Sequence, residues 1–220
     1  FFKKIYSFEP HPETYELLRI NTRNSDNIEI FQFGLSNKND KMIMVTEKGT
    51  QYGASTLSNI QELSSLNHDK TFDVQVKKFD NICQDLKLEK NISFVKLDVE
   101  NHELETLQGM KETLRQHSPI ICLEQNEECF NYFDGEISSK VINFLKENQY
   151  SFIYEITFTR NWKFFNDFHP LIKKIIKMIE AILFDYPKKI SKFSKIDKFS
   201  KKTYPALIFS KKSLNHIIEK

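Results

Sequence analysis

The chain carries its clearest indication of a fold in the stretch Phe94-Val95-Lys96-Leu97-Asp98-Val99-Glu100-Asn101-His102-Glu103. Residues 92–99 are mostly apolar, which predicts a strand that is buried on both faces and central in a parallel sheet. A helix is expected from Asn101 or His102 to Gln116, because apolar residues recur on one side at helical spacing: Leu104, Leu107, Met110 and Leu114. The acidic side chains of Glu103 and Glu105 suit the positive end of that helix.

Strand and helix patterns alternate outward from this stretch in both directions. Further strands are expected at residues 4–8, 28–33, 42–46, 72–79, 119–124, 150–158 and 204–210. One helix is expected to begin at Pro12. A second should follow Asp80 as its N-cap and end near Leu88, and a third should cover residues 136–147. This alternation predicts an α/β fold with helices on both faces of one sheet, and an antiparallel pairing of the last two strands.

The composition is that of a globular protein, and 220 residues suit one domain with a sizeable core. Hydrophobic residues make up 40% of the chain and charged residues 28%, which argues against disorder. A net charge of +2 is small for a dedicated nucleic-acid-binding protein, so nucleic acid is not expected as a partner. No apolar run approaches the length of a membrane span.

Three cysteines, Cys83, Cys122 and Cys129, occur without a CxxC motif or a cluster of His and Cys ligands. An odd number in a chain of this length indicates a reducing compartment, and we expect a cytoplasmic protein. Cys122 lies within an apolar run and is interpreted as a small core residue.

Residues 168–202 interrupt the alternation and are interpreted as a basic amphipathic insertion between the last two strands. Its apolar residues form one stripe: Ile172, Ile175, Ile176, Ile179, Ile182 and Leu183. Residues 188–202 contain seven lysines and one acid, Asp197. Such a segment could lie on an anionic membrane surface. The favoured interpretation is that its apolar face packs on the domain or on a dimer partner; the oligomeric state is left open.

Acidic residues follow three predicted strands at their carboxyl ends, where open parallel sheets bind ligands: Glu9, Asp98 with Glu100, and Glu124. Glu9 could accept hydrogen bonds from the two hydroxyls of a ribose, or it could cap the helix that follows. Asp98 and Glu100 lie on one side of the chain, and His102 nearby is a candidate base near neutral pH. The alternative is that these acids only favour a helix N-terminus electrostatically.

Glu124 could orient a substrate hydroxyl or help Asp98 to hold a cation, or it could be a solvated strand end. Two carboxylates do not establish a magnesium or calcium site, so no metal is predicted. The chain has five glycines, and no two of them stand at GxG spacing. The glycine-rich turn that usually follows the first strand of a nucleotide-binding sheet is therefore not found in this sequence.

Several segments together resemble the FkbM-type S-adenosylmethionine-dependent methyltransferases. Tyr6-Ser7-Phe8-Glu9-Pro10-His11-Pro12 resembles the second strand and helix of that family. The stretch from Phe94 to Glu103 is similar to its Lys-hydrophobic-Asp-hydrophobic-Glu-Gly-x-Glu signature, and Pro119-Ile120-Ile121-Cys122-Leu123-Glu124 resembles the next strand. Gly34-Leu35-Ser36 is a weaker match. The resemblance covers about residues 4–158 and 204–210.

The resemblance implies a Rossmann-like class I methyltransferase sheet, mostly parallel with an antiparallel C-terminal strand. It implies methyl transfer from S-adenosyl-L-methionine to a hydroxyl of a sugar, a glycan or another small metabolite. The cofactor-binding residues that it implies are Glu9, Gly34, Leu35, Ser36 and Asp98, with the segment 34–36 bordering the adenine. The implied catalytic residues are Asp98, Glu100 and His102, and Glu124 is placed on the substrate side.

Two departures from the family pattern leave an alternative open. Asn101 stands where the family has glycine, although asparagine can adopt unusual backbone angles or cap a helix. The family's first strand and glycine-rich loop are expected before Phe1, so residues 1–220 are interpreted as one N-terminally truncated methyltransferase-like domain. The alternative function is a non-catalytic Rossmann-like binding module, associated with a membrane surface through residues 168–202.

Overall fold

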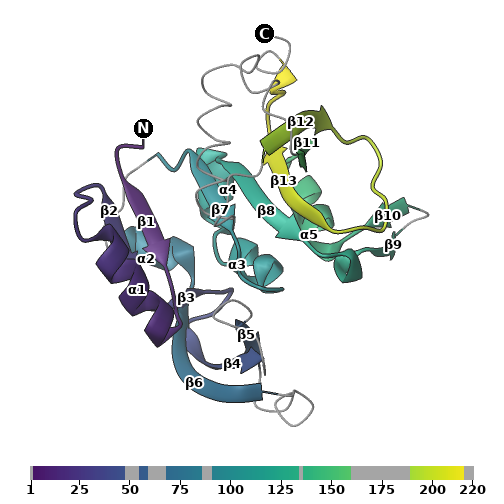
Figure 1. The fold of residues 1–220 in the computed structure, drawn as a ribbon. Helices are drawn as coiled ribbons and strands as arrows, with labels where there is room; N and C mark the ends of the chain where they lie inside the picture. The colour runs from purple at the N-terminus through teal and green to yellow at the C-terminus, as the bar shows by residue number, and fades with distance from the viewer. Residues whose placement is uncertain are drawn as a thin grey trace. The chain divides into compact units, whose positions relative to one another are not determined.

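The structure, a computed structural model, describes residues 2–47, 55–58, 68–85, 91–133, 136–159 and 189–215. The chain divides into two compact units, and Figure 1 shows their elements. The first unit is formed by Phe1–Ile92 and Val99–His117. The second is formed by Ser93–Asp98 and Ser118–Lys220.

A strand–helix–strand arrangement opens the first unit, as the sequence predicts. Strand β1 (Ile5–Phe8) pairs in parallel with β2 (Ile28–Phe31), and helix α1 (Pro12–Thr22) connects them. Pro12 occupies the first turn of α1, where its missing N–H group costs no hydrogen bond. His11 is the N-cap, and its Nδ1 atom accepts from the backbone N–H group of Thr14.

A separate four-stranded sheet follows in the first unit, in the order β3-β6-β4-β5. Its strands are β3 (Gly34–Leu35), β4 (Asp40–Glu47), β5 (Ser55–Ser58) and β6 (His68–Lys77). The pair β3–β6 is parallel, whereas β4 pairs antiparallel with both β5 and β6. Alternating residues of β4 and β6 form a small core of Met42, Met44, Val74 and Val76, against which Phe72 packs.

The helix predicted up to Gln116 is two helices, so that prediction is wrong at Gly109. Helix α3 (Glu103–Gln108) ends there, and α4 (Lys111–His117) begins two residues later. A Cβ atom at Gly109 would clash with the backbone carbonyl group of Ser36, so only glycine allows this close approach. The break therefore serves the packing of the chain next to β3.

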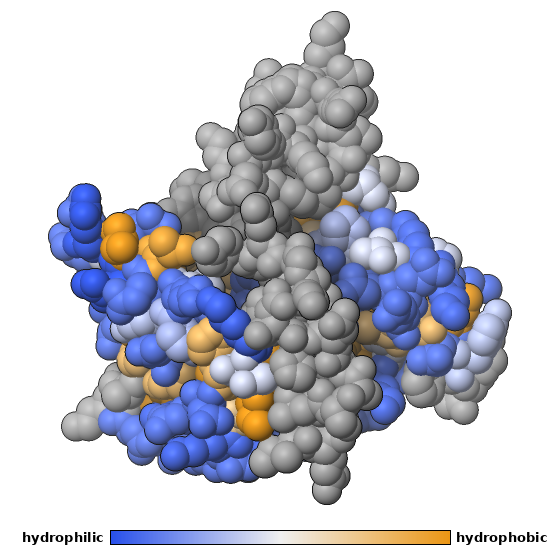
Figure 2. Space-filling model, turned by 60° about the horizontal axis from the view of Figure 1, so that its bottom comes forward, coloured by the Kyte–Doolittle hydropathy of each residue, from blue (hydrophilic) through white to orange (hydrophobic). Residues whose placement is uncertain are grey.

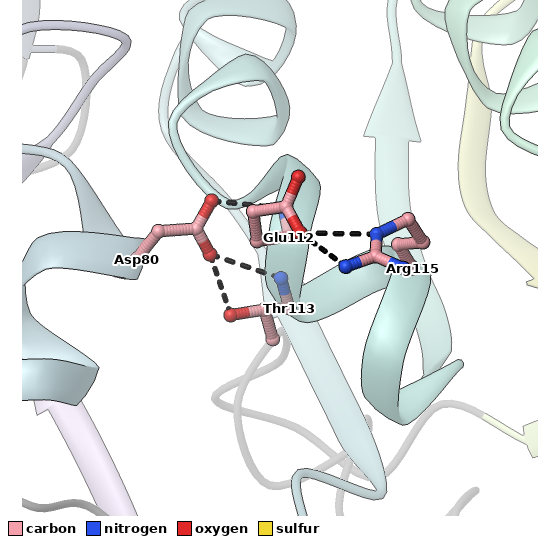
Figure 3. A network of polar contacts seen from close by, with 4 residues as sticks. All are labelled: Asp80, Glu112, Thr113 and Arg115. Carbon is pink, nitrogen blue, oxygen red and sulfur yellow. Dashed lines mark hydrogen bonds and ion pairs between the residues drawn. The ribbon is translucent and has the colours of Figure 1, made fainter.

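Asp80 caps a helix other than its own, which corrects a second prediction. Helix α2 (Phe79–Asp85) already begins at Phe79, so Asp80 is not its N-cap. Figure 3 shows the Asp80 carboxylate at the start of α4, where it accepts from the N–H groups of Glu112 and Thr113 at 2.9 and 3.0 Å. It also accepts from Thr113 Oγ1 at 2.7 Å. The first N–H groups of α4 lack partners within the helix, and Asp80 supplies the acceptor.

The second unit contains a five-stranded sheet in the order β12-β11-β13-β8-β7. Its strands are β7 (Phe94–Leu97), β8 (Ile120–Gln125), β11 (Phe152–Thr159), β12 (Lys189–Lys195) and β13 (Tyr204–Ser210). Only the pair β7–β8 is parallel among these described strands, whereas the other three pairs are antiparallel. The antiparallel pairing of β11 with β13 was predicted.

A mixed α/β fold is confirmed, but one continuous, mostly parallel sheet is not what the described residues form. Strands β1 and β2 make a sheet of their own, and β7 lies at an edge of the five-stranded sheet. The prediction that residues 92–99 are central is therefore wrong within the described part of the chain, and Phe94, Val95 and Lys96 are only half-buried. Strand β8 is central, and Ile121, Cys122 and Leu123 are fully buried as expected.

The segment interpreted as an insertion contributes a strand that the sequence analysis did not predict. Residues 189–195 form β12, which pairs antiparallel with β11. Phe193 of β12 stacks on Tyr154, and this contact explains why phenylalanines interrupt the lysine-rich run. The apolar stripe at residues 172–183 lies outside the described residues.

A hairpin and a helix complete the second unit. After a short 3₁₀ helix (Glu127–Cys129), β9 (Asn131–Phe133) pairs antiparallel with β10 (Glu136–Ser138). Helix α5 (Lys140–Glu147) begins four residues later than predicted, because Ser139 is its N-cap and accepts from the N–H group of Ile142. The core of this unit includes Leu123, Ile142, Leu145, Tyr154, Leu207 and Phe209.

Figure 2 shows one face of the molecule, on which most of the described residues are hydrophilic. On the face drawn in Figure 2, apolar residues lie in small areas among hydrophilic ones. The large apolar side chains with the highest exposure are Leu17, Ile20 and Tyr132. Scattered residues of this kind are common on protein surfaces. Within the ranges that the structure describes, no helix is both long and apolar enough to cross a membrane.

Candidate functional site

Glu9 follows β1 directly and is tied to the start of α1. Its backbone N–H group donates to the carbonyl oxygen of Phe31, which continues the β1–β2 pairing. Its side-chain Oε1 atom accepts from the backbone N–H group of His11 at 2.7 Å. Burial raises the pKa of this carboxyl, and the hydrogen bond from His11 partly opposes that shift. Glu9 therefore orders the turn before α1, which supports its interpretation as a residue that stabilises the start of this helix. The hydrogen bond from His11 involves only one of the two carboxylate oxygens.

Residues 34–36 are held by contacts within the first unit. Gly34 is buried beside Val76 and Pro10, and a Cβ atom there would lie 3.3 Å from Val76 Cγ1. The carbonyl oxygen of Leu35 accepts from Thr106 Oγ1 at 3.0 Å, and the N–H group of Ser36 donates to the carbonyl oxygen of Lys77. These backbone polar groups already form hydrogen bonds within the first unit. The half-buried Leu35 side chain is therefore the part of this segment best suited to pack against an adenine ring.

Ser36 and His102, predicted as a cofactor-binding and a catalytic residue, are brought together. The Nε2 atom of His102 and the Oγ atom of Ser36 lie 3.0 Å apart and share a hydrogen bond. Both side chains are buried, and burial lowers the pKa of His102, so its ring is neutral at pH 7. A buried ring engaged in this way is better suited to fix the start of α3 to β3 than to act as a base.

The turn between β7 and α3 contains two unusual backbone angles. Glu100 and Asn101 have φ values of 47° and 70°. Asn101 stands where the family pattern has glycine, and its φ value shows why this position needs a residue that tolerates the left-handed region. The backbone N–H group of His102 closes the turn by donating to the carbonyl oxygen of Val99 at 3.2 Å.

The carboxyl group of Glu103 lies beneath this turn. It is buried and receives hydrogen bonds from the backbone N–H groups of Glu103, Asn101 and Val99. Burial raises the pKa of Glu103, and the hydrogen bonds lower it. A buried acid that collects the N–H groups of a turn fixes its shape, which was not among the roles that the sequence analysis assigned.

In the second unit, the parallel pairing of β7 with β8 places two predicted site residues side by side. Lys96 pairs with Cys122 and Leu97 with Leu123. The next residues, Asp98 just after β7 and Glu124 within β8, therefore lie at the same level of the pair. Since side chains alternate along a strand, Lys96, Asp98 and Glu124 belong to one face of the pair.

An ion pair joins two of these side chains, and both act electrostatically on the third. Lys96 Nζ lies 3.2 Å from Asp98 Oδ2. Burial raises the pKa of Glu124, the negative charge of Asp98 raises it further, and the positive charge of Lys96 lowers it. We call Lys96, Asp98 and Glu124 the strand-end cluster. Two carboxylates and one ammonium group can bind and orient a hydroxyl group and exchange a proton with it.

Cysteine and metal chemistry find no support among the described residues. Cys83, Cys122 and Cys129 form no disulfide within the described part of the chain, and burial raises the pKa of Cys122 to about 12. In the ranges that the structure covers, no group of three or more His, Cys, Asp or Glu residues is arranged to hold a metal ion. Cys122 is a core residue, as predicted.

Lys96 is the member of the strand-end cluster to which the sequence analysis gave no role. It stands two residues before Asp98 within the stretch that indicated the fold, so period-two alternation would have placed both on one face. The buried Thr106 is a second residue without a predicted role, and it bonds Leu35. Only the three-dimensional contact between α3 and β3 reveals it.

Comparison with known proteins identifies the family. No curated protein matches the chain. The crystal structure of methyltransferase FkbM from Methylobacillus flagellatus KT is similar at 15% identity and a TM-score of 0.36, over 56% of this chain and 26% of that one. The chain thus spans about a quarter of that protein. The model of the methyltransferase FkbM domain matches residues 3–152, which is more than half of the sequence, and the chain therefore belongs to the FkbM methyltransferase domain family.

Proposed function

We propose that the protein transfers a methyl group from S-adenosylmethionine to a hydroxyl of a sugar or another small metabolite. The observation that carries this proposal is the strand-end cluster, because it lies within the family match and follows a parallel strand pair. Ligands of α/β sheets bind beyond the carboxyl ends of parallel strands. Asp98 follows β7, and Glu124 lies in β8 one residue beyond the last residue that pairs with β7.

Glu9 suits the ribose of the cofactor by the chemistry of its carboxylate. Each carboxylate oxygen has two lone pairs, so the hydrogen bond from His11 leaves capacity to accept from two ribose hydroxyls. That hydrogen bond also fixes the orientation of the carboxylate before a ligand binds. The half-buried Leu35 would contribute apolar contact to the adenine. S-adenosylmethionine, when bound, supplies a methyl group on a positively charged sulfur.

The reaction requires alignment of the acceptor hydroxyl and removal of its proton. Asp98 and Glu124 would bind and orient that hydroxyl. Glu100 is proposed as a further catalytic residue, because it stands two positions after Asp98 within the residues that the family model matches. His102 would position the turn between β7 and α3 through its bond to Ser36.

An odd number of cysteines is typical of a reducing compartment, and on that ground we propose a cytoplasmic enzyme, of the EC 2.1.1 type. The acceptor would be a neutral hydroxyl compound, because the described cluster offers carboxylates and one ammonium group and no extended basic surface. Nucleic acid is not proposed as a substrate.

Calorimetric titration of S-adenosylhomocysteine into the wild-type protein and two variants tests the proposal. Glu9→Gln keeps the shape of the side chain but removes its charge, and we expect binding to weaken by about 10- to 100-fold, the worth of hydrogen bonds to a charged group. Glu13→Gln is the matched control, because Glu13 lies on α1 and pairs only with exposed Lys70 among the described residues. Equal binding by wild type and Glu9→Gln would contradict the role of Glu9. No binding by any of the three would favour a non-catalytic module.

A further inference from the structure

Lys96 is held in a way that a surface lysine is not. Its side chain is only 10% exposed, whereas lysine is rarely buried without a partner. Its Nζ atom lies 3.2 Å from Asp98 Oδ2 and donates to the carbonyl oxygen of Leu97 at 2.9 Å. The ammonium group is therefore fixed at two points, both at the carboxyl end of β7.

The two carboxylates of the strand-end cluster have different surroundings. The Asp98 side chain is 43% exposed and forms the ion pair with Lys96. Glu124 is half-buried and is the last residue but one of β8, whose inner residues are fully buried. Neighbouring carboxylates in unlike environments commonly take different chemical roles, one as a fixed charge and the other as the group that exchanges a proton.

His102 is the rival for the proton-accepting role, and its geometry disfavours it. Its Nε2 atom is engaged with Ser36 at 3.0 Å, and its Nδ1 atom lies 3.8 Å from Glu105. The ring is buried within the first unit. Glu124 lies instead beside the last residue of β8, in the second unit.

We propose that Lys96 is a positioning residue that pairs with Asp98 and leaves Glu124 as the carboxylate that receives the proton of the acceptor hydroxyl. This inference rests on the proposed methyltransferase function. The O–H bond breaks, the proton binds a carboxylate oxygen of Glu124, and the electron pair stays on the acceptor oxygen, which is the atom that is methylated. Charge is conserved, since one carboxylate is neutralised as one sulfonium becomes a neutral thioether.

The charged groups around Glu124 define what removal of Lys96 should do. From the β7 side, Asp98 and Lys96 act on Glu124 with opposite signs. From the β13 side, Tyr204 pairs with Gln125 and Leu207 pairs with Leu123, so neither an acid nor a lysine stands at these two positions. Loss of the ammonium group leaves the charge of Asp98 unopposed, and a nearby opposite charge shifts a carboxyl by on the order of one pH unit. The Lys96→Met variant should therefore protonate Glu124 at higher pH than the wild type does.

The deciding experiment follows the carboxyl carbon of Glu124 by ¹³C NMR as the pH is varied, with the signal assigned by its loss in Glu124→Gln. We expect the midpoint to rise by roughly one pH unit or somewhat less in Lys96→Met and to stay near the wild-type value in Lys96→Arg, which keeps the charge. Lys202→Met is the matched control, because Lys202 pairs with Glu155 at 2.7 Å in the same unit. An unchanged midpoint in Lys96→Met, or an equal shift in Lys202→Met, would overturn the inference.

A second measurement links the titration to the reaction. The pH dependence of kcat/KM is measured for methyl transfer from radiolabelled S-adenosylmethionine to a monosaccharide that the wild type methylates. The acidic limb should move upward in Lys96→Met by the shift that NMR reports, whereas a purely structural role would lower the rate equally at every pH. If the wild type is active and the limb does not move, the role of Lys96 is wrong and the proposed function stands. If the wild type neither binds S-adenosylhomocysteine nor methylates any acceptor, the proposed function has failed, and the NMR titration still decides the pairing.

Discussion

Replacement of the half-buried Asp80 by alanine should lower the free energy of unfolding of the first unit more than replacement of an exposed charged residue does. The Asp80 carboxylate accepts the N–H groups of Glu112 and Thr113 and the hydroxyl of Thr113 (Figure 3). Loss of a helix cap costs about 1–2 kcal/mol, and the buried Thr113 hydroxyl adds about 1 kcal/mol. The expected loss in free energy of unfolding is therefore about 2–3 kcal/mol. For a chain of this size, that corresponds to a decrease in Tm of roughly 4–12 °C.

The same network offers its own control. Arg115 forms an ion pair with Glu112 at 2.8 Å, and both side chains are more than half exposed. Exposed pairs of this kind contribute about 0.3–0.5 kcal/mol, so Arg115→Ala should be nearly silent. Thermal unfolding followed by circular dichroism gives the stability, and amide hydrogen exchange shows whether the N–H groups of Glu112 and Thr113 lose protection. If Asp80→Ala loses no more stability than Arg115→Ala, the cap is not formed as described.

Two further predictions concern the contacts around Ser36. Gly109→Ala should lower the free energy of unfolding by about 1–3 kcal/mol, because the new Cβ atom would clash with the Ser36 backbone carbonyl group, which cannot rotate away. A urea unfolding curve that matches that of the wild type would refute this prediction. Because burial lowers the pKa of His102, the unfolded chain takes up the proton more readily, so stability should fall as the pH drops below about 6.5. His102→Gln should flatten that dependence in Tm measurements between pH 7 and 5, and an unchanged slope would show that the ring is not desolvated.

Much of the local structure follows from the sequence. The apolar runs before Asp98 and Glu124, the proline at the start of α1 and the acidic residues at strand ends predicted β7, β8, α1 and the positions of the site residues. These signals are local, because side-chain alternation and the φ of proline act within a few residues. The left-handed angle of Asn101 was also within reach, since asparagine is one of the few residues that tolerate it.

The sequence by itself therefore determined β1, α1, β7 and β8, the family signature, and the carboxylates of Asp98 and Glu124 near the carboxyl ends of β7 and β8. Only the tertiary structure decided that Asp80 caps α4, that Gly109 divides a helix against Ser36, that residues 189–195 form a strand and that His102 is held by Ser36. Each of these contacts joins residues at least 30 positions apart. Such a partner leaves no periodicity in the sequence, because hydrogen bonding and close packing depend on which distant atoms the folded chain brings within reach.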